Sequence, residues 1–317
     1  MKLLVTGANG FVGSAAIQYF ASRGHTVSAH ARVATTYVGN NIKPLQAPYE
    51  DLTLWQDQLE GCDAVVHTAA RVHQVKEDSA DPLRDYRRVN VEYSAALARA
   101  AAKSGVNRFI YLSSIKVNGS CTLKAHAYTA GDRPAPDDPY GISKHEAEQA
   151  LMQLAIETGM EVVVIRPPLI YGPGVKANFL SMMIWLQRGV PLPLGAIYNQ
   201  RSLLGLGNLL DLINVCLTHP QAAHQVFLAS DGQDVSTTEL LLAMGQALGK
   251  PARLVKVPQG WLERAAKLAG KPGFAQRLCG NLAVDISKTR DLLGWQPPVS
   301  LEAGLCETAA HYLQSRS

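Results

Sequence analysis

The stretch that decides the fold opens the chain and reads Lys2-Leu3-Leu4-Val5-Thr6-Gly7-Ala8-Asn9-Gly10-Phe11-Val12-Gly13. A short apolar strand runs into three glycines, and a helical pattern follows through Arg23. This strand–turn–helix order is the context that a dinucleotide-binding loop requires. Gly7 would permit the tight turn, Gly10 would let the backbone approach a pyrophosphate, and Gly13 would let the helix pack closely on the strand. The pyrophosphate would rest at the helix N-terminus, where free N–H groups favour anions.

The residues after the second expected strand bear on the choice of cofactor. That strand is expected from His25 to His30, and the chain continues into Ala31 and Arg32. An NAD-binding fold usually ends this strand with an acidic residue that bonds the ribose hydroxyls, whereas a nearby Arg accommodates a 2′-phosphate. A guanidinium can bind the phosphate and stack on adenine; the alternative for Arg32 is a solvated loop arginine. The sequence therefore predicts NAD(P) and favours NADP(H) over NAD(H).

Tyr140 and Lys144 are the main candidates for catalysis. They stand four residues apart, so a helix would place them on one face, and they follow Ser113 and Ser114 at the end of an apolar run. A free Tyr has a pKa of about 10, and a nearby cation lowers it. Tyr140 could then exchange a proton with a substrate while a hydride moves to or from the same carbon. Of the 11 tyrosines, only Tyr140 has Lys four residues later.

The composition is that of a soluble globular protein, with 47% hydrophobic and 18% charged residues. No apolar run approaches the ~20 residues that a membrane helix needs, and the first segment reads as a strand, not as a signal peptide. The five cysteines are scattered and form no metal-type pair, which fits a reduced, cytoplasmic setting. The net charge is only +4 and no long basic run is present. We therefore expect a cytoplasmic protein with no metal, nucleic-acid or membrane partner.

Strand and helix signals alternate as far as Arg166 and then give way to a stretch broken by Pro and Gly. Strands are expected at 65–67, 108–112 and 161–165, and helices at 81–104 and 140–158. Alternation of this kind predicts a parallel sheet with helices on both faces, and a chain of 317 residues is long for one core. We predict an α/β fold with a doubly wound Rossmann domain over residues 1–166, to which later segments return. A smaller mixed C-terminal substrate lobe would occupy residues 167–317.

Further motifs follow the glycine loop in a fixed order. They are Asp51-Leu52, His67-Thr68-Ala69-Ala70, Asn90-Val91, Ser113-Ser114, Tyr140-x-x-x-Lys144, Arg166-Pro167-Pro168-x-x-Tyr171-Gly172-Pro173-Gly174, Arg201-Ser202 and Asp285-x-x-Lys288-x-x-x-x-Leu293-Gly294-Trp295. With the glycine loop they resemble the extended short-chain dehydrogenase/reductase family, in particular its NAD(P)-dependent nucleotide-sugar epimerases, dehydratases and 4-keto-reductases. The resemblance spans essentially the whole chain.

The resemblance implies a role for each matching position. Tyr140 would be the acid/base, Lys144 would bond the nicotinamide ribose and tune Tyr140, and Ser114 would hydrogen-bond the reacting oxygen. Asn90 would support the active-site backbone. The implied cofactor-binding residues are Thr6, Gly7, Asn9, Gly10, Phe11, Val12, Gly13, Arg32, Asp51, Leu52, Ala69, Ala70, Asn90, Ser113, Tyr140, Lys144 and Pro167.

A second set of residues would hold the substrate. It consists of Arg71, Ser114, Lys116, Tyr140, Asn178 and Arg201. Arg201 matches the position where family members grip a substrate phosphate, which a guanidinium binds bidentately. Lys116 would bond a sugar or phosphate oxygen, or it is a loop lysine. Asn178 would reach the sugar nucleotide, or it is the N-cap of a helix.

Departures from the family pattern narrow the reaction. Family dehydratases carry an Asp-Glu pair just after the catalytic Ser or Thr, and here those positions are Ile115 and Lys116. The sequence therefore disfavours dehydration. Leu169 replaces the usual substrate-contacting Asn, and Gly205 and Gly207 replace a Tyr and an Asp. These changes put the sugar contacts near them in doubt.

The implied reaction is hydride transfer at C4 of a UDP-linked hexose or hexosamine. A 4-keto-reductase would take one hydride from NADPH, whereas a 4-epimerase would remove the hydride and return it to the other face. Arg32 favours the reductase slightly. Reduction of a non-sugar ketone or acyl-CoA, and a non-catalytic cofactor-sensing role, are less favoured. The resemblance also implies synthesis of surface-polysaccharide precursors, and a homodimer formed through the helix that carries Tyr140 and the helix before it.

Overall fold

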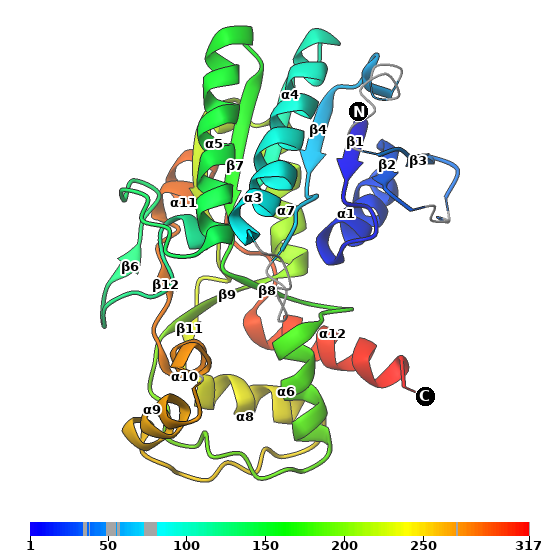
Figure 1. Ribbon diagram of the computed structural model, residues 1–317. Helices are drawn as coiled ribbons and strands as arrows, with labels where there is room; N and C mark the ends of the chain where they lie inside the picture. The colour runs from blue at the N-terminus through cyan, green and yellow to red at the C-terminus, as the bar shows by residue number, and fades with distance from the viewer. Residues whose placement is uncertain are drawn as a thin grey trace.

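A parallel sheet of seven strands forms the centre of the N-terminal lobe (Figure 1). The computed structural model describes residues 1–33, 37, 39–48, 55, 58–72, 81–270 and 272–316. The strands are β1 (Lys2–Thr6), β2 (Thr26–Ala31), β3 (Ile42–Gln46), β4 (Ala64–His67), β5 (Arg108–Leu112), β7 (Glu161–Arg166) and β10 (Gln225–Leu228). Their order is β10-β7-β5-β4-β1-β2-β3. The strands β2 and β3, which follow β1 in sequence, lie on one side of it, and those that follow β4 lie on the other side. A ligand is therefore expected at the carboxyl ends of β1 and β4, where the order reverses. The predicted fold class is confirmed.

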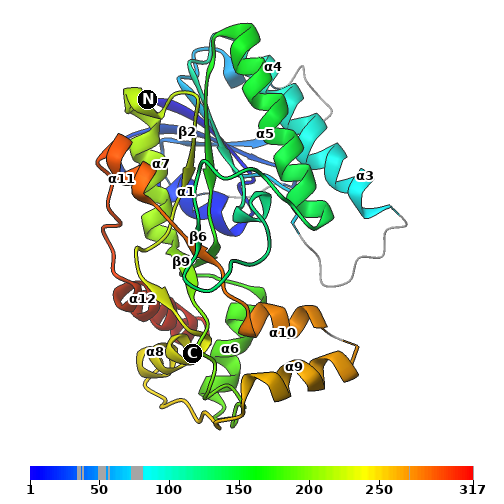
Figure 2. The same cartoon turned by 90° about the vertical axis from the view of Figure 1, so that its left-hand side faces the viewer.

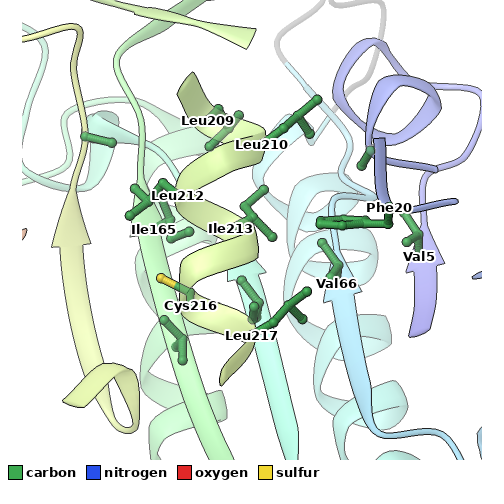
Figure 3. Close-up of a cluster of buried hydrophobic side chains, with 14 of the residues drawn as sticks. Val5, Phe20, Val66, Ile165, Leu209, Leu210, Leu212, Ile213, Cys216 and Leu217 are labelled. Carbon is green, nitrogen blue, oxygen red and sulfur yellow. The ribbon is translucent and has the colours of Figure 1, made fainter. Parts of the chain in front are cut away.

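Alternate residues of each strand face two different helix layers. In β7, Val162 and Val164 pack with α4 (Tyr93–Lys103) and α5 (Pro139–Thr158). Val163 and Ile165 face the opposite layer, made by α1 (Phe11–Ser22) and α7 (Leu206–Thr218). Figure 3 shows the leucines of α7 over the strands, with Phe20 and Val66 beside them. Burial on both faces explains the continuous apolar runs in the strand sequences.

The helix expected over residues 81–104 is divided in the structure. It consists of α3 (Pro82–Arg87), a π-helical turn at Arg88–Glu92, and α4. The start is as expected, because the Asp81 side chain accepts a hydrogen bond from the N–H of Arg84 at 3.1 Å. A π turn inserts one extra residue and is frequent at functional sites. Here it contains the buried Asn90.

The C-terminal lobe is built on a small mixed sheet in the order β11-β9-β8. Its strands are β8 (Leu169–Tyr171), β9 (Arg201–Gly205) and β11 (Asp234–Val235). Its helices are α6 (Ala177–Gln187), α8 (Thr237–Ala247), α9 (Gln259–Leu268), α10 (Pro272–Cys279) and α12 (Leu301–Gln314). A separate apolar core joins α6, α8 and α12. A capping box formed by Ser236 and Glu239 opens α8.

Segments after residue 166 also lie on the N-terminal sheet. Besides α7 and β10, α11 (Ser287–Leu293) packs there, and Thr289 donates a hydrogen bond to the carbonyl of Leu228 at 2.6 Å. The indole N–H of Trp295 donates to Asp211 of α7 at 3.0 Å. A two-stranded sheet pairs β6 (Ala127–Tyr128) with β12 (Ala283–Val284). Of the helices that the structure describes, none has the length and apolar character needed to span a bilayer.

Candidate active site

The glycine loop forms a bare backbone surface at the end of β1. Gly7 has φ +76°, in the left-handed region that favours glycine, and its carbonyl accepts a hydrogen bond from the N–H of Gly10 at 2.8 Å. A Cβ on Gly13 would lie 2.1 Å from the carbonyl oxygen of Gly7, and a Cβ on Gly10 would lie 3.0 Å from it. The expected turn at Gly7 and the close helix–strand packing at Gly13 are therefore present. With no side chain at Gly10, the protein backbone of this turn is free to approach a pyrophosphate.

A buried hydrogen-bond chain supports this edge of the sheet. The hydroxyl of Thr6 contacts Nδ1 of His67 at 2.7 Å, and Nε2 of His67 contacts the hydroxyl of Ser94 at 2.8 Å. The N–H of Ala69 donates to the same Thr6 hydroxyl at 3.3 Å. Burial lowers the pKa of His67 to about 3, so the ring stays neutral at ordinary pH. Thr6 thus fixes the loop after β4 beside Gly7, and this loop holds the buried Ala69 and the half-buried Ala70.

The remaining cofactor candidates near β2 are only partly described. Arg32 is exposed just beyond the end of β2, and the amide of Asn9 donates to the carbonyl of Val33 at 3.2 Å. Phe11 and Val12 are half-buried in the first turn of α1 and pack against the core of the N-terminal lobe. Asp51 and Leu52 lie outside the described residues. The hydrogen bond from Asn9 to Val33 therefore links the glycine loop to the segment that carries Arg32.

Asn90 holds two parts of the site together. Its Oδ1 accepts from the N–H of Arg71 at 2.8 Å, and its Nδ2 donates to the carbonyl of Arg71 at 3.1 Å and to the hydroxyl of Ser143 at 2.9 Å. The Arg71 guanidinium lies 5.6 Å from the ring centre of Tyr86 and 3.5 Å from Asp85. Asn90 therefore braces the loop after β4 against the helix that carries the catalytic candidates.

Tyr140 lies in the first turn of α5, beside the end of β5. The N-cap Asp138 accepts from the N–H of Gly141 at 2.7 Å, which fixes where the helix begins. Burial raises the pKa of Tyr140, and a hydrogen bond with Ser114 opposes this effect. The ring of Tyr86 meets the ring of Tyr140 edge-on, with centroids 6.0 Å apart. The structure thus brings Ser114 and Tyr140 together, as the sequence predicts.

Lys144 is buried on the same face of α5, but its ammonium has other partners. The Nζ atom donates to the carbonyl of Leu112 at 2.7 Å and lies 4.1 Å from the ring centre of Tyr111. Burial lowers the pKa of Lys144 to about 7, and the carboxylate of Glu148 partly opposes this shift. The expected lowering of the Tyr140 pKa by Lys144 does not occur in this structure, where the cost of burying a phenolate dominates and raises that pKa.

Glu148 continues the Tyr140–Lys144 face by four more residues and joins it to the sheet. It accepts from the hydroxyl of Ser113 at 2.5 Å and forms a buried ion pair with Arg166, whose Nη2 lies 2.5 Å from Oε2. The spacing that selected Lys144 could have selected Glu148 as well. Nothing in the sequence, in contrast, signalled the contact between Tyr86 and Tyr140.

We expect Glu148→Gln to move the alkaline limb of the pH–activity profile to lower pH. The carboxylate favours the charged form of Lys144, so its removal should lower the Lys144 pKa below about 7. If turnover requires the ammonium, activity is then lost at a lower pH. The profile of kcat/KM against pH measures the shift. Glu146→Gln is the matched control, because Glu146 lies on the same helix and pairs instead with Arg87 at the surface. Equal profiles for Glu148→Gln and the wild type would contradict the assignment.

The other predicted substrate residues lie at different places. Lys116 pairs with Asp138 at 3.1 Å and donates to Ser120 at 2.5 Å, so it braces the N-terminus of α5. Asn178 is exposed near the start of α6, and its alternative reading as an N-cap is wrong, because Lys176 occupies that position. Arg201 is half-buried in β9 and donates to the carbonyl of Gly280 at 3.1 Å.

Two hydrogen bonds from backbone N–H groups hold the segment after β5 in place. The carbonyl of the buried Pro167 accepts a hydrogen bond from the N–H of Ile115 at 2.9 Å, which ties the segment after β7 to the segment after β5. The hydroxyl of Ser114 accepts from the N–H of Lys116 at 3.2 Å and starts a short 3₁₀ turn.

Over the ranges that the structure describes, no group of three His, Cys, Asp or Glu side chains is arranged to hold a metal ion.

Sequence comparison identifies the family. The model of the NAD dependent epimerase/dehydratase family matches residues 3–228. The chain belongs to this family. A curated protein of Vibrio cholerae, described as UDP-glucose 4-epimerase, is 44% identical over 320 residues, which cover 100% of this chain and 97% of that protein. The expected family is confirmed, and so is the expectation of an enzyme that uses a nicotinamide cofactor.

Solved structures share the fold of this family member. The UDP-glucose 4-epimerase of Thermotoga maritima, determined with UDP-glucose, has a TM-score of 0.80 at 22% identity and covers 100% of both chains. The UDP-glucuronic acid 4-epimerase of Bacillus cereus, in complex with NAD, has a TM-score of 0.79 at 20% identity, covering 99% of this chain and 97% of that one. These likenesses support the fold. The expected preferences for 4-keto-reduction and for NADP(H) find no support in the comparisons.

Proposed function

We propose that this enzyme is a 4-epimerase of a UDP-linked hexose that works with a bound NAD. The observation that carries the proposal is the pairing of Tyr140 with Ser114 at the end of β5, on the sheet edge that the glycine loop shares. The 44% identical relative described as a UDP-glucose 4-epimerase supports the same reaction. The absence of carboxylates at Ile115 and Lys116 argues against dehydration.

The residues divide the work of such a reaction. Bound NAD supplies the hydride acceptor and donor for C4 of the sugar. Tyr140 takes the proton of the C4 hydroxyl as the carbonyl forms and returns it when the alcohol is restored. Ser114 holds the reacting oxygen by a hydrogen bond. Its hydrogen bond with Tyr140 opposes the rise in the Tyr140 pKa. Lys144 places an ammonium near this site below about pH 7, and burial makes it lose that charge as the pH rises through its pKa of about 7.

The described residues fit a dinucleotide. Gly7, Gly10 and Gly13 leave the pyrophosphate space free of side chains, and α1 presents its N-terminus there without an acidic residue in its first turn. Ala69 and Ala70 are small enough to border the nicotinamide side. We propose NAD as the resident cofactor, and Arg32 leaves NADP as the alternative, because it is exposed beside the place where a 2′-phosphate would lie.

A 4-keto-reductase is the second candidate, and Arg32 favours it. A reductase consumes NADPH once in each turnover, whereas an epimerase needs no net redox. Incubation with UDP-glucose and with UDP-galactose, without added cofactor, separates the two. We expect each substrate to give the same equilibrium mixture of UDP-glucose and UDP-galactose. Proton NMR of the sugar follows the conversion. Steady NADPH oxidation with a UDP-4-keto-6-deoxy-hexosamine, and no interconversion of the hexoses, would replace the epimerase proposal with the reductase.

We expect Arg201→Leu to raise the KM for the UDP-sugar by about 30-fold, with a much smaller change in kcat. A hydrogen bond between charged groups contributes roughly 1.5–3 kcal/mol, and a phosphate contact acts on ground state and transition state alike. Initial rates over a range of UDP-sugar concentrations measure both constants. Arg188→Leu is the control, because Arg188 is an exposed arginine of the same lobe. An unchanged KM in Arg201→Leu would remove Arg201 from the substrate site.

We also propose a cytoplasmic homodimer that forms through α4 and α5. Ile156 of α5 is 81% exposed, although it is a large apolar residue on a helix that otherwise packs against the sheet. A second copy would cover it. The mass in solution, measured by light scattering, tests this proposal, and a monomer at micromolar concentration would reject it.

A further inference from the structure

Helix α9 carries a stripe of exposed apolar side chains. None of its residues is buried, and Trp261 and Leu268 are 70% and 90% exposed. Ala265 is exposed as well, and its spacing places it on the same helix face as the other two. A surface helix of a globular protein normally turns its apolar stripe toward the core. Here the stripe faces away from the core, and Leu262 and Ala266 on the adjoining face are partly covered.

The sequence from residue 250 to residue 280, which contains α9, is rich in positive charge. Between residues 250 and 280 the basic residues are Lys250, Arg253, Lys256, Arg264, Lys267, Lys271 and Arg277, and the one acidic residue of that sequence is Glu263. The whole chain has a net charge of only +4, so the rest of the sequence is net negative. Arg264 and Lys267 are exposed. Arg264 stands three residues after Trp261 and four before Leu268, so it flanks the stripe directly.

The helix lies where a large flat surface could reach it. Figure 2 shows α9 and α10 side by side at the outer edge of the C-terminal lobe, below the end of α5 that carries Tyr140. Figure 1 likewise places the pair away from the seven-stranded sheet. The helix therefore lies at the outer edge of the C-terminal lobe, and the exposure of Trp261 and Leu268 shows that the N-terminal lobe does not cover them.

We propose that α9 docks peripherally on the surface of an anionic phospholipid bilayer. An interfacial helix has an apolar face that enters the headgroup region and Lys or Arg beside it, and Trp is enriched at that depth. Trp261 and Leu268 supply the apolar face, and Arg264 and Lys267 supply the charge. The expectation of no membrane partner rested on the lack of a spanning segment, and docking on the surface requires none.

Charge and apolar character together favour an anionic bilayer over a second copy of the chain and over a nucleic acid. A second copy of the chain would bring one basic helix against another, which like charges oppose. A nucleic acid would use the basic residues and could stack a base on Trp261, but it would leave the aliphatic side chain of Leu268 exposed to water. An anionic bilayer uses both features of α9.

Co-sedimentation with lipid vesicles tests the proposal on the full chain. We expect the wild type to sediment with vesicles of equal parts phosphatidylglycerol and phosphatidylcholine, and at least about tenfold less with phosphatidylcholine alone. Binding should weaken as salt is raised, because ions screen exposed charges. The tryptophan emission should shift to the blue on binding, and this shift should be absent in Trp261→Ala. No sedimentation of the wild type with the anionic vesicles would overturn the proposal.

Paired variants separate the apolar and the charged contributions. Trp261→Ala/Leu268→Ser and Arg264→Gln/Lys267→Gln should each lower vesicle binding by about tenfold or more, and turnover of a soluble UDP-sugar should stay unchanged. The matched controls are Leu123→Ser, which removes a side chain that is 77% exposed, and Lys43→Gln/Lys124→Gln, which removes two exposed lysines.

Two results would count against the docking surface. If the controls lose as much vesicle binding as the α9 variants, the attraction belongs to the whole surface and the proposal fails. The second result is that the wild type does not bind the vesicles and that Trp261→Ala/Leu268→Ser changes the mass of the protein in solution. The stripe would then be a protein interface, and the proposal fails. Normal turnover in each variant shows that the fold is intact.

Discussion

Replacing Tyr140 by phenylalanine should lower kcat by about 10²–10⁴-fold and leave the binding of cofactor and UDP-sugar nearly unchanged. The ring of Tyr140 packs edge-on against Tyr86, and phenylalanine preserves this contact. Only the hydroxyl that bonds Ser114 is removed. This hydroxyl is the group that we assign to take the proton of the C4 hydroxyl, so without it the reaction loses its acid/base.

The measurement is turnover of the preferred UDP-sugar, together with a thermal shift on adding the sugar and NAD. Tyr198→Phe is the control, because the side chain of Tyr198 is 76% exposed and loses only a hydroxyl. Wild-type turnover in Tyr140→Phe would remove Tyr140 from the chemistry. A Tyr140→Phe protein that lost ligand binding as well would point to a structural role for the hydroxyl instead.

Local spacing made much of the site predictable. The glycine loop, the strand at 108–112 and the helix with Tyr140 and Lys144 each depend on neighbours within a few residues, so the sequence reports them directly. The capping box at Ser236 and Glu239 is of the same kind. The resemblance placed these pieces in one family, and the family model confirms it over residues 3–228.

Long-range contacts account for what the sequence did not reveal. Arg166 and Glu148 are 18 residues apart, and their buried ion pair forms only because β7 and α5 pack together. The same packing brings the Lys144 ammonium to the carbonyl of Leu112 on β5. The four-residue spacing between Tyr140 and Lys144 could not predict this contact with the sheet. Lys116, for which the sequence left a substrate contact and a loop lysine open, pairs with Asp138, since the loop after β5 lies against the start of α5.

Burial explains why the electrostatic expectation failed. Spacing on a helix suggests that the cation of Lys144 stabilises a phenolate on Tyr140. Removal of both groups from water disfavours both charged forms, which raises the pKa of Tyr140 and lowers that of Lys144 to about 7. A sequence gives the order of charges along a helix, but the depth of the site decides which effect is larger.

Replacing Gly13 by alanine should cost about 3 kcal/mol of unfolding free energy and abolish NAD binding. The added Cβ would stand 2.1 Å from the carbonyl oxygen of Gly7 and 2.7 Å from its carbonyl carbon. Both atoms belong to the backbone of a tight turn, so neither can move aside as the end of a flexible side chain would. Relief requires α1 to move away from β1, and overpacking of this kind typically costs about 1–3 kcal/mol. The same movement would open the cradle for the pyrophosphate.

Gly207→Ala supplies the matched control for this effect. Gly207 also lies near the start of a helix, but a Cβ there would meet only a Val299 methyl at 4.0 Å, and an alanine in a helix is favoured by roughly 0.5–1 kcal/mol. Urea denaturation should therefore show Gly207→Ala at least as stable as the wild type and Gly13→Ala markedly weaker. Equal stability and NAD affinity for the two variants would mean that the contact between α1 and the turn is loose. Because that contact aligns the N-terminus of α1 with the end of β1, the loss in Gly13→Ala should appear in cofactor affinity even where the protein still folds.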